Sequence, residues 1–165
     1  MARYLTTFLV VLVITGSPAA AAESPRERLG MLIGDWTVAG REDSFREVCD
    51  WFHERSHVVC NSESRGSKGL RKGVSVLSYS DATGRYSYYH YGSSGVAIAQ
   101  DIFFQGTTMI STVERTVGAD VLREQVWVTP QADGSMDFRE DVSKNGGPWE
   151  AGTRIRYVRR AASSQ

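Results

Sequence analysis

The sequence has few cysteines and lacks the motifs by which the common classes of enzyme are recognised. It has two cysteines in 165 residues and no C-x-x-C pair, which argues against a thioredoxin-like redox site. It contains no phosphate loop, no G-x-G-x-x-G after a strand and no G-x-S-x-G elbow. Carboxylate pairs such as Asp137 and Glu140 have no spacing that selects them for acid–base work. We therefore assign no catalytic residue, no metal site and no cofactor, and an enzyme is the less favoured interpretation.

Excess charge of either sign is also missing. The 19 basic residues balance 19 acidic ones, and there is no run of like charge. Removal of residues 1–22, whose one charge is Arg3, leaves 18 basic and 19 acidic residues, a net charge of −1. Nothing in this balance attracts nucleic acid or an anionic membrane over the whole surface.

The first 22 residues have the three-part pattern of a secretory signal peptide. Arg3 precedes an apolar run from about Leu5 to Ile14, and a small-x-small pair, Ala20 and Ala22, precedes Glu23. The apolar run is short for a membrane span, although an uncleaved anchor is the alternative. We expect cleavage after Ala22, export to the periplasm or beyond, no later membrane span, and one domain over residues 23–165.

The two cysteines stand in the stretch CDWFHERSHVVC, and an exported protein meets conditions in which disulfides persist. A hairpin with its turn at residues 53–56 would place Cys49 opposite Cys60, close enough for a bridge. A zinc site that also used His53 and His57 is the alternative, although it would crowd four ligands into one turn. We predict a disulfide between Cys49 and Cys60.

Strand signals dominate the rest of the chain. Residues 25–33 carry an N-cap and first-turn proline pattern that predicts one short helix. Nine or ten strands follow with a turn about every ten residues, which is typical of a sandwich or barrel. Short connections favour an up-and-down antiparallel β-barrel. The expected strands are residues 36–39, 45–52, 57–63, 72–79, 85–91, 97–104, 107–116, 121–129, 136–142 and 153–159.

Gly34–Asp35–Trp36 after a short helix, together with arginines in the last strand, resembles the lipocalin (calycin) pattern. In that family a G-x-W begins the first strand and an arginine of the last strand packs over the tryptophan. The resemblance implies structural roles for Gly34, Trp36 and either Arg156 or Arg159. We assign the arginine's role to Arg156.

Nearly the whole chain after residue 22 also resembles a family of bacterial secreted proteins of unknown activity with a lipocalin-like, calycin-type barrel. The similar segments are residues 29–36, 49–60, 78–86, 92–95, 143–149 and 157–159. Family members often carry glycines at the first hairpin turn, where this chain has His53–Glu54–Arg55. The resemblance implies a fold and an export route, and it carries over no catalytic residue.

The most suggestive constellation for binding is aromatic and basic. We expect the barrel interior to be lined by Tyr88, His90, Arg115, Arg123 and Trp127. Such a lining could hold a small, partly apolar molecule or an organic anion. In the alternative interpretation, the tyrosines and the tryptophan are core residues and the charges pair on the surface.

The functional expectation is an exported barrel that binds a small, partly apolar molecule in its interior. Two alternatives remain open. The barrel could be filled by side chains and serve a structural or interaction role, or it could bind haem through His90. Ligand identity and oligomeric state do not follow from the sequence.

Overall fold

The computed structural model describes residues 24–160, and every structural statement below refers to this part of the chain. The predicted signal peptide, residues 1–22, lies outside the described residues. One short helix and ten strands make up the fold. They are η1 (Glu27–Leu32), β1 (Gly34–Val38), β2 (Phe45–Phe52), β3 (His57–Gly66), β4 (Gly69–Ser80), β5 (Arg85–Gly92), β6 (Ala97–Gln105), β7 (Thr108–Val117), β8 (Asp120–Pro130), β9 (Met136–Lys144) and β10 (Trp149–Arg159).

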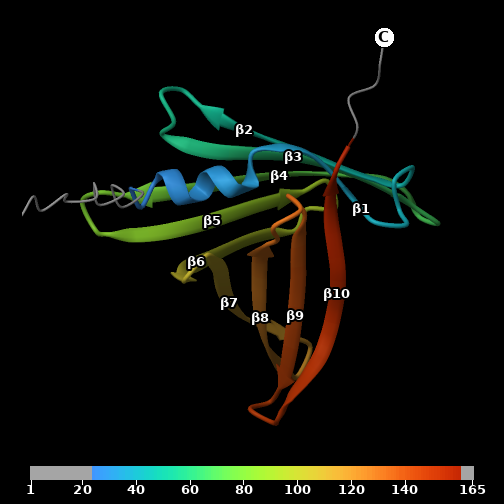
Figure 1. Ribbon diagram of the computed structural model, residues 1–165. Helices are drawn as coiled ribbons and strands as arrows, with labels where there is room; N and C mark the ends of the chain where they lie inside the picture. Colours follow the sequence, from blue (N-terminus) through green and yellow to red (C-terminus); the bar gives the residue numbers. More distant parts are fainter. Residues whose placement is uncertain (1–23, 161–165) are drawn as a thin grey trace, which may run out of the picture.

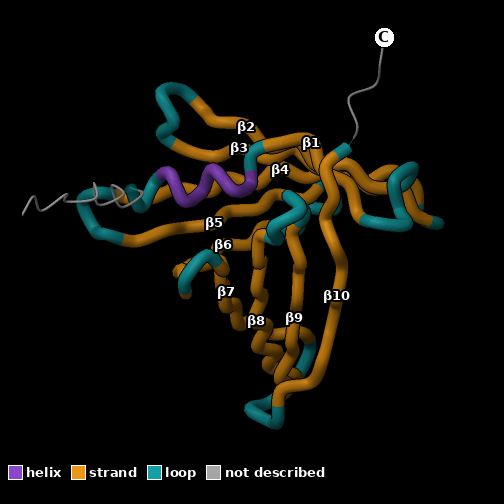
Figure 2. Tube along the Cα trace, in the orientation of Figure 1, coloured by secondary structure: helices purple, strands orange, loops and turns teal. Residues whose placement is uncertain are grey.

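The strands form a closed antiparallel barrel, which confirms the predicted fold class. Each strand pairs with its neighbours in the chain, and β1 pairs with β10 to complete the ring. Figure 1 shows β2–β5 running across the direction of β8–β10, so the two parts of the barrel are strongly inclined to each other. Figure 2 shows that strands make up most of the trace and that loops join their ends. Closure leaves no free sheet edge. A meander of this many strands favours a barrel for that reason.

The ends of several elements differ from the prediction. The loop expected after residue 63 is shorter, because β3 continues to Gly66 and β4 already begins at Gly69. The predicted helix over residues 25–33 is a single 3-10 segment, Glu27–Leu32. Its start is held by a reciprocal pair, in which the Glu27 N–H donates to Ser24 Oγ (3.3 Å) and the Ser24 N–H donates to Glu27 Oε2 (3.2 Å). The last strand begins at Trp149 rather than Thr153, because β10 continues past a register irregularity between Ala151 and Arg154.

The segment that contains η1 closes one end of the barrel. Leu29 and Leu32 are buried against the core, and Leu32 also faces the interior. The Tyr86 hydroxyl on β5 donates to the Pro25 carbonyl (2.6 Å), and the Arg28 guanidinium lies 4.3 Å from the centre of the Phe104 ring on β6. The short helix therefore contacts strands on several sides of this opening.

The first hairpin has the register that the sequence predicts. Phe52 lies opposite His57, and Cys49 lies opposite Cys60, with which it forms a disulfide. Both cysteines are therefore consumed, so neither is free to hold zinc. A disulfide between neighbouring strands suggests an oxidising, exported environment.

The turn of this hairpin uses two backbone conformations that favour glycine, although the chain has other residues there. Glu54 and Arg55 have φ angles of +51° and +58°, in the left-handed region that favours glycine. A side chain in this region costs about 1–2 kcal/mol per residue. The turn is closed by the Ser56 N–H, which lies 3.1 Å from the Phe52 carbonyl.

Removal of the disulfide is expected to lower the free energy of unfolding by about 2–3 kcal/mol, because the bridge restricts the conformations of the unfolded chain. The measurement is urea unfolding of a double variant, Cys49→Ala with Cys60→Ala, followed by circular dichroism. Reductant should produce a similar loss in the wild type and none in the double variant. If neither the double substitution nor reduction of the wild type changed the unfolding midpoint, the disulfide would not stabilise the fold.

Candidate functional site

A cavity of about 270 Å³ lies inside the barrel. Its lining is mainly apolar and comes from η1 and from all strands except β1. The apolar residues are Leu32, Leu77, Ile98, Met109, Val126, Val128, Met136 and Phe138, together with the Cys49–Cys60 disulfide. The alternation of strand residues produces this lining, since every second side chain of a barrel strand points inward. The barrel is therefore not filled completely by its own side chains.

Two tyrosines add polar groups to this lining. The Tyr88 hydroxyl on β5 lies 3.2 Å from Ser75 Oγ on β4, and burial raises the pKa of Tyr88. Tyr157 on β10 packs edge-on against Phe45 and Phe138, and burial is again the main cause of its raised pKa. Both phenols stay protonated near neutral pH, so each can donate or accept one hydrogen bond inside the cavity.

Three carboxylates also line the cavity, and two of them already have partners. Glu124 on β8 forms an ion pair with Arg115 on β7. Glu140 on β9 accepts a hydrogen bond from the Thr153 N–H at 3.4 Å. The third, Glu47 on β2, has no hydrogen-bond or ion-pair partner among residues 24–160.

Glu47 faces the cavity from the middle of β2. It is paired across the sheet with Trp36, and both point to the barrel interior. The side chain is half-buried, and its outward neighbours along β2, Arg46 and Val48, occupy the other face. Burial raises the pKa of Glu47 from an ordinary 4.5 to about 7. A carboxyl in this position can exchange a proton near neutral pH.

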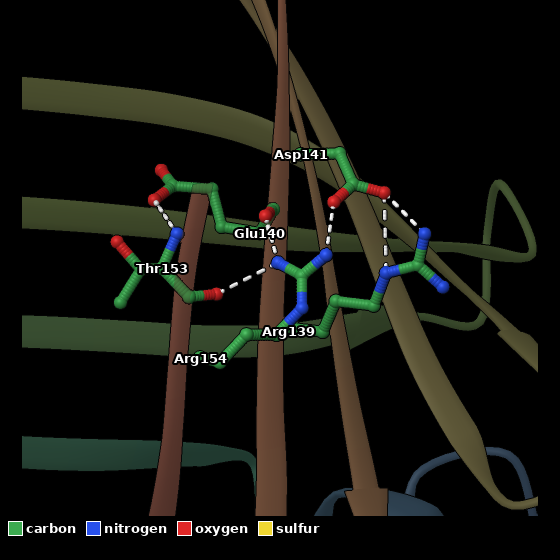
Figure 3. A network of polar contacts seen from close by, with 5 residues as sticks. All are labelled: Arg139, Glu140, Asp141, Thr153 and Arg154. Atoms are coloured by element: carbon green, nitrogen blue, oxygen red, sulfur yellow. Dashed lines mark hydrogen bonds and ion pairs between the residues drawn. The ribbon is translucent and has the colours of Figure 1, made fainter. Parts of the chain in front are cut away.

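Figure 3 shows how Glu140 is held at the irregular part of β10. Arg154 donates to the Glu140 and Thr153 carbonyls and forms an ion pair with Asp141, which Arg139 contacts from the other side. The hydrogen bond from Arg139 is the main cause that lowers the pKa of Asp141, and Arg154 adds to the effect. The network fixes β9 against β10 where the normal ladder is interrupted.

Of the predicted ligand-binding residues, Tyr88 lines the cavity and His90 lies beside it. The His90 ring is stacked on Tyr88 at 6.4 Å, and its Nδ1 lies 3.0 Å from Ser75 Oγ. Gly73 on β4 leaves room for this ring, because a Cβ there would lie 2.6 Å from His90 Cε1. His90 faces a second, more polar hollow that also contains Arg71 and Lys72.

The expected placement of Arg123 and Trp127 in the interior is wrong. Glu124, Val126 and Val128 of β8 point inward, so Arg123 and Trp127 lie on the outer face by alternation. Arg123 pairs there with Glu114, 3.1 Å away, and the Arg139 guanidinium lies 4.4 Å from the Trp127 ring centre. Arg115 does share the inward face with Glu124, but their ion pair occupies its guanidinium.

The arginine that packs over Trp36 is Arg159, and the assignment to Arg156 is wrong. The Arg159 guanidinium lies 4.3 Å from the Trp36 ring centre and donates to the Ile33 carbonyl at 3.0 Å. The register decides this, because Arg159 lies opposite Trp36. Arg156 points to the other face and forms an ion pair with Asp133 (2.7 Å).

Gly34 and Trp36 both contact Arg159 where the first and last strands meet. Gly34 has a φ of +148°, and a Cβ at this position would collide with the Arg159 guanidinium. Glycine is therefore needed for the arginine to reach the ring. The Trp36 indole N–H donates to the Leu32 carbonyl at 2.7 Å, which ties η1 to the first strand.

The cavity carboxylates are the residues that sequence reasoning missed. Glu47, Glu124 and Glu140 each sit at an inward position of a strand whose inward neighbours are largely apolar. Alternation alone could have marked them as charged residues on an apolar face. Their convergence on one space depends on the register of strands that are far apart in the chain.

Within the part of the chain that the structure describes, no group of three His, Cys, Asp or Glu side chains is arranged to hold a metal ion. No helix of residues 24–160 has the length and apolar character needed to cross a membrane. No protein-family model and no curated protein matches this chain at a significant level of similarity.

Proposed function

We propose that this chain is an exported protein that binds a small, partly apolar molecule inside its barrel. The observation that carries the proposal is the cavity of about 270 Å³ with its mainly apolar lining and few polar groups. Pockets for small ligands typically combine these features. The volume lies near the lower end of the range for pockets that hold small molecules, so we expect a small ligand.

Export is supported by the Cys49–Cys60 disulfide and by the signal-peptide pattern of residues 1–22. The closed ten-strand barrel and the Gly34–Trp36–Arg159 arrangement are consistent with a lipocalin-like, calycin-type protein. We include membership of such a family in the proposal.

A neutral aromatic alcohol tests whether the cavity accepts a ligand. Phenethyl alcohol should bind the wild type in calorimetric titration. A Ser111→Phe variant should bind at least about tenfold more weakly, because Ser111 is buried and lines the cavity, which the larger ring would fill.

Thr112→Phe is the matched control, since Thr112 is the next residue of β7 and lies exposed on the outer face. It should leave the affinity unchanged, and circular dichroism should show that both variants fold. Equal binding by the wild type and Ser111→Phe, or no binding by the wild type, would count against the proposal. Native mass spectrometry of protein purified from its own cells would then give the mass of the natural ligand.

A further inference from the structure

We propose that the cavity selects a small amine, with an apolar body in the barrel and a protonated nitrogen paired with the Glu47 carboxylate. This inference rests on the proposed function, and it names the class of ligand. Its basis is the sign of the charges around the cavity and the lack of a partner for Glu47 among the described residues.

The charge of the lining excludes the organic anion that the sequence suggested as one option. Three carboxylates line the cavity, and its lining within residues 24–160 includes no lysine, arginine or histidine. Arg115, the nearest inward-facing cation on β7, is neutralised by Glu124. An anion in this space would lie beside the carboxyl groups of Glu47 and Glu140, which have no ion-pair partner among the described residues, and such repulsion is strong in a medium of low dielectric constant.

The state of each carboxylate points to Glu47 as the group that meets the ligand. The Glu124 carboxylate is committed to Arg115, and the Glu140 carboxylate accepts a hydrogen bond from Thr153. The Glu47 carboxylate has neither kind of contact with any described residue. A buried ion without a partner is costly, and a cation that arrives with the ligand would supply the missing partner.

The surroundings of Glu47 also fit the remainder of such a ligand. Ser75 and Tyr88 offer hydroxyl groups to further N–H or O–H groups of the ligand. Leu32, Met109 and Met136 line the cavity with apolar surface for a hydrocarbon or aromatic body. Methionine side chains adapt readily to ligands of different shape.

The pH dependence of binding follows from the proton on Glu47. Ion pairing needs the carboxylate form, so binding of an ammonium group releases a proton below the Glu47 pKa of about 7. Affinity should rise with pH up to this value and then level off until the amine itself loses its proton. The other titratable side chains that line the cavity are Tyr88, Glu124, Glu140 and Tyr157, of which Tyr88 and Tyr157 interact electrostatically with Glu47. His90, Arg115 and Arg159 lie beside it on inward-facing positions.

The test compares three probes that share a phenyl body: phenethylamine, phenethyl alcohol and phenylacetate. Calorimetric titration of the wild type at pH 8 should give the tightest binding for the amine and the weakest for phenylacetate. Amine binding should be about 30-fold weaker at pH 5.5 than at pH 8, as a single proton with a pKa of about 7 requires. Alcohol binding should not change over this range.

A Glu47→Gln variant keeps the shape of the side chain and removes its charge. We expect amine binding at pH 8 to weaken at least about tenfold, with no effect on the alcohol and no remaining pH dependence for the amine. Glu114→Gln is the matched control, because Glu114 lies on the outer face of β7, paired with Arg123. It should leave all three affinities unchanged.

The outcomes separate this inference from the proposed function. Binding of the alcohol without preference for the amine, or tightest binding of phenylacetate, overturns the amine inference and leaves a ligand-binding barrel. An amine preference that persists in Glu47→Gln, or that is independent of pH in the wild type, also overturns the role of Glu47. Failure of all three probes to bind overturns the proposed function and the inference together.

Discussion

The Trp36→Ala variant is expected to lose about 3–5 kcal/mol of unfolding free energy, the range for truncation of a large aromatic residue in a core. Trp36 is only 1% exposed and has contacts with three elements. Its indole N–H donates to the Leu32 carbonyl at the end of η1, and the Arg159 guanidinium of β10 packs over its ring. The substitution would leave a cavity, an unsatisfied carbonyl and an arginine without its aromatic contact at the point where the barrel closes.

Urea unfolding followed by circular dichroism measures this effect, with equal slopes required for the comparison. Trp149→Ala is the matched control, because Trp149 lies on β10 with 47% of its surface exposed. It should change stability by less than about 0.5 kcal/mol. Similar losses in both variants would show that Trp36 is not a special contact of the closed barrel.

A Glu47→Gln variant should gain stability relative to the wild type as the pH rises from 5 to 8. The folded state holds a proton on Glu47 up to a pKa of about 7, whereas the unfolded chain releases it near 4.5. The contribution of Glu47 to stability is therefore fully present below about pH 4.5 and is lost as the pH rises through this window. The difference corresponds to about 3 kcal/mol above pH 7, to order of magnitude.

Comparison of the two proteins isolates this effect from other titrations. Several carboxyl groups have lowered pKa values, among them Asp35 and Asp133, whose hydrogen bonds come first from Arg46 and from Ser135. Their contributions are lost in the acid range below pH 4, outside the window used here. Glu114→Gln should follow the wild type at every pH. If the stabilities of the wild type and Glu47→Gln changed with pH in the same way, the raised pKa of Glu47 in the folded protein would be contradicted.

The loss of stability that the Glu47 charge causes at neutral pH suggests a role for this residue in ligand binding. Replacement of this carboxyl by an uncharged group should stabilise the free protein at neutral pH, so the fold has no need of its charge. A group that is unfavourable for folding and faces a cavity is a candidate for interaction with a ligand. The stability measurement and the binding measurement examine the same carboxyl independently, since one uses the free protein and the other uses the probes.

Local patterns were sufficient to predict the strands and the first hairpin. The spacing of CDWFHERSHVVC sets the Cys49–Cys60 register, because a short turn allows few ways to pair its flanking strands. Gly34 and Trp36 were likewise recognisable from their neighbours. The start of the last strand was harder, since β10 passes through an irregularity between Ala151 and Arg154.

Long-range register decided what local patterns left open. Arg156 and Arg159 are both plausible partners for Trp36 in the sequence, and the β1–β10 pairing selects Arg159. Arg123 and Trp127 were assigned to the interior together with Tyr88, yet the phase of β8 turns them outward. A shift of one residue exchanges the two faces of a strand, so phase cannot be inferred from composition.

The sequence by itself determined the all-β class, the short leading helix, the hairpin that carries the disulfide and the approximate strands, because each depends on neighbours in the chain. Tertiary structure alone decided that Glu47, Glu124 and Glu140 share one cavity and that Glu47 is left without a partner among the described residues. These residues come from β2, β8 and β9, and closure of the barrel brings them together. Their shared environment, and the raised pKa of Glu47, follow from burial that no local segment contains.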